Sequence, residues 1–307
     1  MAVKQQPVAG PSAVRPPVPA GRATRERVLG YRAQRLLIRG FGWALLALVL
    51  LVALFPVYFM SITAFHPPSL GYGTKPTLFS TDLTLRAFRD LLRQYQFLVW
   101  MRNSFLVSVL NTVLAVALAT FAAYSLARLR YPGRRFFSSA TFLVYLFPST
   151  LLFIPIFILL NDLKLLNSFI GLIAVYLTFT IPFSVWLLKA YFLNIPMELE
   201  DAALVDGATR FQSMLRVVLP LAAPGIAAAA IYAFTLSWNE YLYAFILLSD
   251  SEKFTLAPGM TKLVFGDVFL WGMIMAGGFL MSLPILALYF FAQRYLVAGL
   301  TAGAVKG

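Results

Sequence analysis

Long apolar runs separated by short polar segments are the dominant pattern of this chain. Six stretches, free of charged residues except for Glu240, lie near 41–64, 104–126, 136–160, 168–188, 224–247 and 270–292. Each is long enough to cross roughly 30 Å of hydrocarbon as an α-helix. The pattern therefore predicts an all-α integral membrane protein with six transmembrane helices.

Prolines lie inside several of these stretches. The third contains Pro148 and Pro155, the fourth Pro182 and the sixth Pro284. A proline inside a span kinks the helix and frees carbonyl groups, which neighbouring helices or a water-filled cavity must satisfy. This favours a bundle of spans around a polar path over a single membrane anchor.

Composition supports the membrane assignment and narrows the chemistry. Hydrophobic residues make up 60% of the chain and charged residues 12%, which is far from the average for a soluble domain. Cysteine is absent, so disulfides and thiolate metal sites are excluded, and a single histidine, His66, argues against a histidine metal site. The net charge of +13 does not indicate nucleic acid, because the basic residues flank the apolar runs.

The basic residues also orient the spans. The segment between the second and third spans carries Arg128, Arg130, Arg134 and Arg135 and no acid, so the positive-inside rule places it in the cytoplasm. Arginines precede the first span on the same side. Both termini and the segment 189–220 are then also expected in the cytoplasm.

Four arginines in the outer segment 66–103 oppose this orientation: Arg86, Arg89, Arg93 and Arg102. That segment is longer, and the positive-inside rule applies best to short loops. The helical spacing of Leu85, Phe88 and Leu92 predicts an amphipathic helix at the outer interface. We therefore keep the assignment with both termini inside.

An acidic segment, 194–208, interrupts the apolar pattern between the fourth and fifth spans. Pro196 suits the first turn of a helix, and Glu198, Glu200 and Asp201 follow where the positive end of the helix dipole favours carboxylates. Asp206-Gly207 is a turn signal that ends this helix.

A second short helix is predicted directly after that turn. Thr209 can cap it, and Phe211, Met214, Leu215 and Val218 form an apolar stripe at helical spacing. A helix–turn–helix placed between two spans offers a docking surface to a soluble partner.

Residues 200–220 resemble the signature loop of bacterial ABC-importer permeases. That loop has an acid followed by two alanines, then Asp-Gly-Ala, then an apolar residue before Leu-Pro. Here the matching residues are Asp201-Ala202-Ala203, Asp206-Gly207-Ala208 and Val217 ahead of Leu219-Pro220.

Other segments are similar to the sugar-importing branch of that family, the permeases like the second membrane subunit (MalG-like) of maltose and trehalose importers. They are the ending Val297–Gly307, Trp238–Tyr241 in the fifth span and Ala123–Arg128 at the end of the second. The resemblance spans roughly residues 100–307 and a less specific first span.

The resemblance implies the type I ABC importer (MetI-like) permease fold. The chain then divides into a disordered, basic and proline-rich cytoplasmic tail (1–35), a first transmembrane helix (36–65), an extracytoplasmic segment with an amphipathic helix (66–100), a permease core with five transmembrane helices and the cytoplasmic coupling loop 189–220 (101–297), and a C-terminal cytoplasmic tail (298–307).

The resemblance also implies a role and partners. The chain would form the pathway for a disaccharide or oligosaccharide, such as maltose or trehalose, across the bacterial inner membrane. A homologous second permease would complete a heterodimer, a dimer of ABC ATPases would dock on the coupling loop, and an extracytoplasmic sugar-binding protein would deliver the sugar. The chain would hold no cofactor or metal, because ATP and Mg²⁺ bind to the ATPase.

Two sets of residues are assigned to contact with the ATPase on this basis. The coupling loop supplies Glu198, Glu200, Asp201, Ala202, Ala203, Asp206, Gly207, Ala208, Phe211, Leu219 and Pro220, and the C-terminal tail supplies Ala302, Gly303, Lys306 and Gly307. One position departs from the family, whose loop usually opens with Glu where this chain has Asp201. The shorter side chain leaves open whether Asp201, Glu198 or Glu200 makes the main contact.

Glu240 is the one carboxylate within a predicted span, and Trp238 and Asn239 adjoin it. Intramembrane acids usually face a bundle interior or a cavity, so these three residues are candidates for the substrate pathway. A structural pairing of Glu240 and an interfacial anchor role for Trp238 stay open. For Asn111 in the second span, hydrogen bonding between helices is the expected role.

The sequence also limits the rival functions. A Gly-rich phosphate loop ending in Gly-Lys-Ser/Thr does not occur, so the chain is not expected to be the ATPase, and a membrane enzyme is remote. An ion-gradient-driven secondary transporter would have matching halves with charges in each, and Glu240 has no counterpart. An importer of glycerol-phosphate would need Arg or Lys inside the pathway, and none of the six predicted spans contains one.

Overall fold

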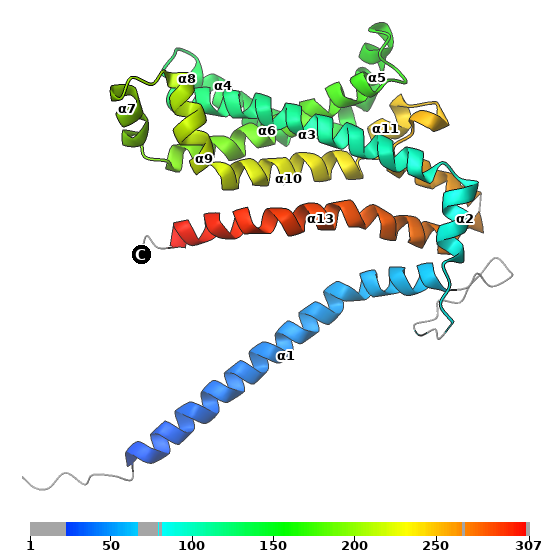
Figure 1. Ribbon diagram of the computed structural model, residues 1–307, viewed down its shortest axis with the longest axis horizontal. Helices are drawn as coiled ribbons and strands as arrows, with labels where there is room; N and C mark the ends of the chain where they lie inside the picture. Colours follow the sequence, from blue (N-terminus) through cyan, green and yellow to red (C-terminus); the bar gives the residue numbers. More distant parts are fainter. Residues whose placement is uncertain (1–22, 67–78, 80–81, 266–267, 305–307) are drawn as a thin grey trace, which may run out of the picture. The chain divides into compact units, whose positions relative to one another are not determined.

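The computed structural model describes residues 23–66, 79, 82–265 and 268–304, and the side chains of 36–66, 79, 82–264 and 269–294. This part of the chain is mostly helical (Figure 1). Among the described residues, four helices are long and apolar enough to cross a membrane, and counting each of two bent helix pairs as one further span gives six. The predicted all-α membrane fold is confirmed.

In the described ranges, the elements that follow one another along the chain are helices and a sheet of two short strands. In order they are α1 (Ala23–Phe65), α2 (Arg86–Gln94), α3 (Phe97–Arg128), α4 (Arg134–Leu146), the 3₁₀ helix η1 (Ser149–Leu152), α5 (Phe153–Asp162), α6 (Phe169–Asn194), α7 (Glu198–Val205), α8 (Arg210–Ser213), the π-helix η2 (Met214–Val218), α9 (Leu219–Leu221), α10 (Ala223–Asn239), α11 (Leu242–Leu247), η3 (Ser251–Lys253), α12 (Leu256–Met260), η4 (Thr261–Leu263), β1 (Val264–Phe265), β2 (Val268–Phe269) and α13 (Trp271–Ala304). The two short strands pair antiparallel, with Val264 opposite Phe269.

The chain divides into two compact units, Met1–Pro56 and Val57–Gly307, with the boundary inside α1. In the first unit, the described side chains (36–56) are all exposed. A helix that is apolar all round suits a lipid-facing span.

The start of α1 corrects one expectation. The helix begins at Ala23, whereas residues 1–35 were expected to be disordered. The last proline of the tail is Pro19, and residues 23–35 contain four arginines and two alanines, which are good helix formers. Residues 1–22 lie outside the described part.

The third span is broken into two half-helices. Its halves, Arg134–Leu146 and Ser149–Asp162, meet at an angle of 86°. Phe147 is extended at the break, with φ −74° and ψ 129°. A residue before proline is pushed out of the helical region, so Pro148 accounts for the break.

The fifth span is also interrupted, and its predicted end at 247 is wrong. The helices Arg210–Leu221 and Ala223–Asn239 meet at 78°, and α10 ends at Asn239 with Glu240 extended (φ −70°, ψ 127°). Residues 242–247 form the separate helix α11.

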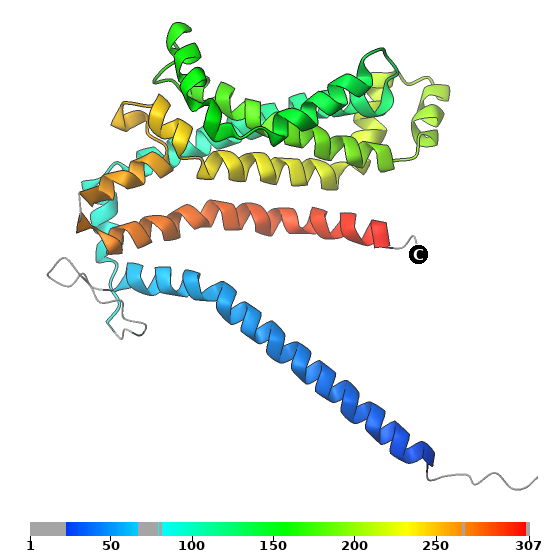
Figure 2. The same ribbon diagram turned by 180° about the vertical axis from the view of Figure 1, so that it is seen from behind.

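Helices α3, α6 and α10 pack together at the centre of the second unit (Figures 1 and 2). On α3, Ala115, Ala119 and Ala123 repeat every fourth residue and are fully buried. Helix α10 has a matching row of buried small residues at every fourth position, namely Gly225, Ala229, Ala233 and Ser237. Small residues at this spacing let helix backbones approach closely, which is the usual source of helix–helix stability in membranes.

A polar contact joins the same three helices. Asn111 of α3 donates to Ser237 Oγ of α10 at 2.6 Å, and Thr180 of α6 donates to Asn111 Oδ1 at 3.4 Å. All three side chains are buried. The helix-joining role predicted for Asn111 is confirmed.

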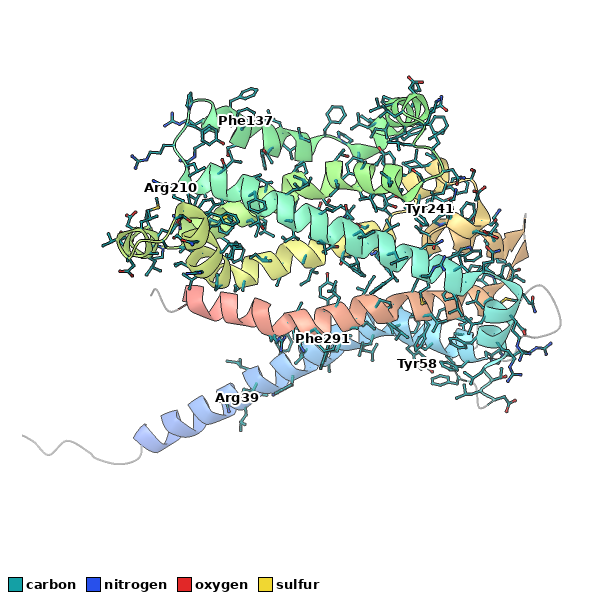
Figure 3. The ribbon with its side chains drawn as sticks, turned by 45° about the horizontal axis from the view of Figure 1, so that its top comes forward. Arg39, Tyr58, Phe137, Arg210, Tyr241 and Phe291 are labelled. Atoms are coloured by element: carbon teal, nitrogen blue, oxygen red, sulfur yellow. The ribbon has the colours of Figure 1, made fainter. Side chains whose placement is uncertain are left out.

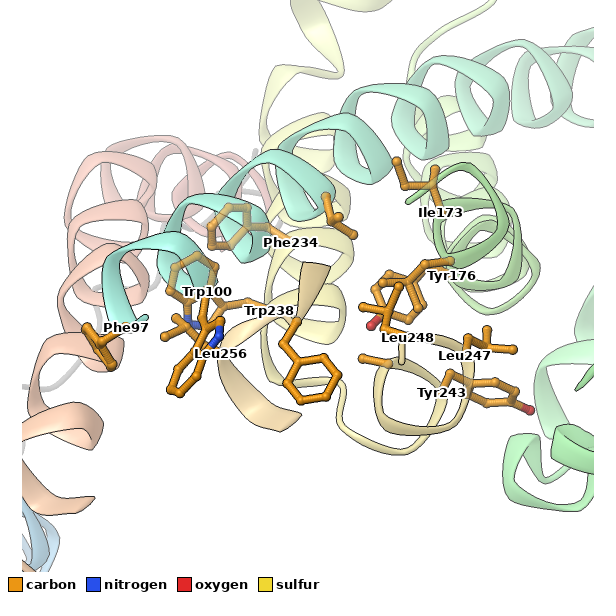
Figure 4. Packing of buried hydrophobic residues seen from close by; sticks show 14 of the residues in the cluster. Phe97, Trp100, Ile173, Tyr176, Phe234, Trp238, Tyr243, Leu247, Leu248 and Leu256 are labelled. Carbon is orange, nitrogen blue, oxygen red and sulfur yellow. The ribbon is translucent and has the colours of Figure 1, made fainter. Parts of the chain in front are cut away.

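A cluster of large side chains fills the bundle at the end where α11 and α12 lie (Figure 4). Trp238 is 1% exposed, stacks on Phe234 and donates from Nε1 to the Met281 carbonyl at 3.1 Å. Trp100 of α3 packs against Gly259 of α12.

The predicted amphipathic helix is present as α2, but its buried face differs from the prediction. Ala87 and Leu91 are buried, and Phe88 packs against Phe65 and Phe279. Leu85 and Leu92 are exposed. Leu85 precedes the first residue of the helix, and Leu92 lies about 100° round the helix from the buried Leu91.

Candidate coupling site

Helices α7, α8 and α9 lie at one end of the bundle, with the C-terminal end of α13 and the loop before α4 (Figures 1 and 2). Figure 3 shows Phe137 and Arg210 toward this end and Tyr241 toward the other. The acidic segment, the arginine-rich loop and the C-terminal helix end therefore face the same side.

The first helix of the predicted pair forms and ends as the sequence indicates. Ile195, which precedes Pro196, is extended and ends α6. Helix α7 begins at Glu198, so Pro196 lies before its first turn rather than inside it. At its other end Gly207 has φ +88°, and the Gly207 and Ala208 amides donate to the Leu204 and Ala203 carbonyls. This is a Schellman motif, which needs a left-handed residue and so favours glycine.

The second helix carries the predicted cap. Thr209 Oγ1 accepts from the Gln212 amide at 3.2 Å, and Gln212 Oε1 accepts from the Thr209 amide at 2.9 Å, which is a capping box. The chain then widens into the π-helix η2 before Leu219-Pro220. Pro220, which is exposed, and the half-buried Leu219 start α9.

The apolar stripe predicted on this second helix is divided between two faces. Met214 and Val218 are buried in the bundle, whereas Phe211 and Leu215 are 57% and 43% exposed. Phe211 stacks on Phe121 of α3, with ring centroids 6.4 Å apart. The π-helix changes the residue register, so the sequence spacing of a regular α-helix does not apply here.

The three acids of α7 have different surroundings. Glu198 and Asp201 are exposed, whereas Glu200 is buried. Glu200 Oε1 forms an ion pair with Arg128 Nε at 2.5 Å, and Oε2 accepts a hydrogen bond from the Tyr124 hydroxyl at 2.9 Å. Glu200 therefore faces the bundle, and Glu198 and Asp201 are the acids open to a partner.

The rest of the coupling loop forms an exposed, mainly apolar surface. Leu199 and Val205 are 45% and 88% exposed. The family-assigned residues Ala202, Asp206 and Gly207 are exposed, and Ala203 and Ala208 are half-buried.

Two of the arginines that suggested orientation have structural roles that the sequence did not reveal. Arg128 donates from Nη2 to the Ile195 carbonyl at 2.7 Å. Arg134 donates to the carbonyls of Leu126, Ala127 and Leu129 at 2.6, 3.2 and 3.3 Å, which satisfies free acceptors at the end of α3. Arg130 and Arg135 are exposed.

The three pathway candidates lie at the end of α10 but in different environments. Trp238 is buried, as described above, and Asn239 is exposed and donates to the Thr235 carbonyl at 2.8 Å. Glu240 accepts from the Tyr243 and Ala244 amides at 2.9 and 3.0 Å and from the Tyr176 hydroxyl at 2.9 Å. Its carboxylate thus satisfies free amides at the start of α11.

The loop after α11 is held firmly by polar contacts. Asn103 donates to the Glu252 and Phe254 carbonyls, and Trp100 Nε1 to that of Ser251. Asn167 donates to Asp250 Oδ2 at 2.6 Å, and Lys253 lies 3.2 Å from the same oxygen. The hydrogen bond from Asn167 and then that from Lys253 lower the pKa of the exposed Asp250 carboxyl.

Two further expectations concern the ends of helices. Helix α13 continues to Ala304, so Ala302 and Gly303 of the predicted C-terminal tail are helical, while Lys306 and Gly307 lie outside the described residues. Helix α6 runs to Asn194 and contains Lys189, which donates to Ser138 Oγ. The helix therefore extends beyond the predicted end of the fourth span at 188, and Lys189 lies one residue outside that predicted span.

Comparison with known proteins gives a consistent result. Residues 115–302 match the model of the family described as binding-protein-dependent transport system inner membrane component. The chain is 38% identical over 264 residues to the inner membrane ABC transporter permease protein YcjP of Escherichia coli, covering 85% of this chain and 94% of YcjP. It is also 38% identical over 264 residues to the diacetylchitobiose uptake system permease protein DasC of Streptomyces coelicolor, covering 85% and 95%.

A solved structure has the same fold. It is a chain of a bacterial ABC transporter involved in the import of the acidic polysaccharide alginate, with a TM-score of 0.74 and 24% identity. The match covers 86% of this chain and 98% of that one.

Proposed function

Because the chain belongs to the family of binding-protein-dependent transport system inner membrane components, we propose that it lines the membrane pathway of an ATP-driven sugar importer. The kind of sugar is inferred from the relative DasC, which is named as a permease of a diacetylchitobiose uptake system. We propose a disaccharide or short oligosaccharide as the substrate.

The observation that carries the proposal is the surface of the coupling loop. Helix α7 presents Asp201, Leu199 and Val205 to solvent while its fold is fixed by caps at its C-terminal end. An exposed apolar patch beside acids is typical of a protein interface. We propose that an ABC ATPase dimer binds this surface, with Asp201 and Glu198 supplying the charged contacts and Phe211 an apolar one.

ATP hydrolysis is assigned to that partner. The sequence has no Gly-rich phosphate loop ending in Gly-Lys-Ser/Thr, and such a loop is what cradles the phosphates in these motors. This chain is therefore proposed to be the non-enzymatic membrane subunit, with ATP and Mg²⁺ bound only by the ATPase.

We propose that the α7 end of the bundle faces the cytoplasm. The loop between α3 and α4 lies at that end. This loop and the first turn of α4 carry the exposed Arg130 and Arg135, as the positive-inside rule requires. The C-terminal end of α13 lies there too, so a tail containing Lys306 and Gly307 would reach the same ATPase.

The opposite end is assigned to sugar entry. A binding protein would dock over the rigid loop around Asp250, and a homologous second permease would complete the pathway. Of the three pathway candidates, Asn239 is the exposed one, and its neighbours Tyr241 and Phe245 form a stacked pair, 42% and 48% exposed. A stacked aromatic face beside an amide is suited to a sugar.

The test is ATP-dependent uptake by the complete importer in proteoliposomes, with radiolabelled diacetylchitobiose, maltose or trehalose as probes. We expect Val205→Asp to lower uptake by at least about tenfold, because it places a charge in an interface core. Leu163→Asp is the matched control, since Leu163 is also exposed (57%) but follows α5 at the other end. Uptake driven by an ion gradient without ATP would contradict the proposal.

A further inference from the structure

We propose that Tyr124, Arg128 and Glu200 form a buried anchor that makes α3 move together with the coupling helix α7. The inference rests on the proposed function, because it concerns how a displacement of α7 enters the bundle. It assigns Glu200 to the inside of the permease rather than to contact with the ATPase.

One face of α3 engages both oxygens of the Glu200 carboxylate. Tyr124 and Arg128 are one helical turn apart, and they reach Oε2 at 2.9 Å and Oε1 at 2.5 Å respectively. The Arg128 and Glu200 side chains are 5% and 4% exposed. A carboxylate held at both oxygens by one rigid helix has a fixed direction as well as a fixed distance.

The same guanidinium also holds the segment that leads into α7. Arg128 Nη2 donates to the Ile195 carbonyl at 2.7 Å, and Nη1 lies 3.6 Å from Met197 Sδ. Arg128 therefore binds the α6–α7 linker and α7 itself, so the linker cannot act as a free hinge between them.

The position of α3 makes this connection consequential. Helix α7 otherwise packs against α8 and η2, which follow it in the chain, whereas α3 is far from it in sequence. Helix α3 packs along both α6 and α10, and its Ala119 and Ala123 belong to the same buried cluster as Val185 of α6 and Ala229 of α10. A displacement that α7 passes to α3 therefore reaches the centre of the bundle.

Stability alone does not require an ion pair here. A buried pair is often no more stable than apolar residues of the same volume, but loss of one partner leaves an uncompensated buried charge. The Arg128–Glu200 ion pair instead fixes the relative geometry of α3 and α7, which is needed if the two helices are to move together.

The first experiment measures the joint directly. The chain has no cysteine, so spin labels can be placed at Val205→Cys on α7 and Arg130→Cys beside the end of α3, both exposed positions. Because Val205 belongs to the proposed ATPase interface, the distance is measured in the purified full-length permease in lipid nanodiscs, where we expect a narrow distribution. Glu200→Gln should broaden it, and a distribution that Glu200→Gln leaves unchanged would overturn the proposal.

The second experiment measures sugar transported per ATP hydrolysed in proteoliposomes. We expect Glu200→Gln and Arg128→Gln to lower this ratio by at least about fivefold, because each leaves a buried charge without its partner, while the ATPase still co-purifies with the permease. Asp162→Asn, an exposed acid at the end of α5 that belongs neither to the anchor nor to the proposed ATPase surface, should leave the ratio unchanged. Loss of the ATPase from the Glu200→Gln complex would mean that Glu200 contacts the partner instead.

Two controls keep the outcomes separate. If Glu200→Gln does not accumulate in the membrane, Tyr124→Phe removes only one hydrogen bond, and its ratio and distance distribution decide the question. If the wild-type complex fails to transport sugar with ATP, the proposed function is wrong, and the distance measurement on the permease still tests the anchor.

Discussion

Gly225 lies where α10 passes the ring of Tyr191 at the end of α6. A Cβ atom at this position would come within 2.5 Å of the ring. The neighbouring Ala222 and Ala229 are 1% and 0% exposed, so the helices have no free space into which they could shift. A single hydrogen atom in place of a side chain thus sets the separation of two spans.

Replacing Gly225 with valine should therefore destabilise the permease by about 1–3 kcal/mol, the usual cost of overpacking. The measurement is thermal unfolding in detergent, followed by tryptophan fluorescence. Gly40→Ala is the control, because nothing lies within 4 Å of a Cβ added there. Equal unfolding temperatures for wild type and Gly225→Val would contradict the close packing.

Single residues also show where sequence patterns stop being informative. The sequence identifies three acids at the start of α7 but cannot say which one is buried, because that depends on Arg128, far away in the chain. Glu240 likewise looks like a pathway carboxylate from its position in an apolar run. Its partners, Tyr176 and two amides, become visible only in three dimensions.

The pair of short helices at the coupling loop depends on its own local signals. The Schellman motif at Gly207 and the capping box of Thr209 with Gln212 satisfy backbone groups that a helix of four to eight residues would otherwise leave free. Both caps could be predicted from the sequence because the residues that form each cap lie within a few positions of one another.

Removal of the cap should be measurable without loss of the fold. Thr209→Ala should cost about 1 kcal/mol locally, and the amides of α8 should then exchange hydrogen for deuterium roughly fivefold faster. Thr209→Asn, which keeps a capping oxygen, should exchange like the wild type. Slow exchange in the alanine variant would show that packing alone holds this helix.

The breaks within the third and fifth spans were less predictable than the caps. Pro148 marks the first break, and the sequence indicated a kink there. No proline precedes Glu240, where α10 ends. There the Asn239 side chain donates to the Thr235 carbonyl, and the Glu240 carboxylate accepts from the Ala244 amide, so side chains replace helical backbone hydrogen bonds. The length of the apolar run therefore gave too long a helix for the fifth span, which was predicted to end at 247 and ends at Asn239.

For the molecule as a whole, the apolar pattern was enough to predict a helical bundle, and the family loop was enough to locate the end that carries α7. What the pattern could not provide was the assembly of the bundle, since the contacts of Asn111 and the stripes of small residues join helices far apart in the sequence.

The orientation of the whole bundle can be tested with single cysteines. Arg130→Cys in the loop before α4 and Ser251→Cys in η3, after α11, place a thiol at exposed positions. The loop before α4 lies at the α7 end of the bundle and α11 at the other end. With a membrane-impermeant maleimide on intact spheroplasts, we expect labelling at position 251 and none at 130, and the reverse in inverted vesicles. Labelling of position 130 from outside would contradict the orientation and the coupling assignment together.

The half-helices of the third span have a consequence for biogenesis. Helix α4 has 13 residues, or about 20 Å at 1.5 Å a residue, which is shorter than the roughly 30 Å hydrocarbon layer. Such a short helix is not stable in the lipid while backbone amides and carbonyls at the break beside it have no hydrogen-bond partner. Nascent chains must therefore keep this crossing sheltered, by the translocon or by water, until downstream helices emerge and close around it.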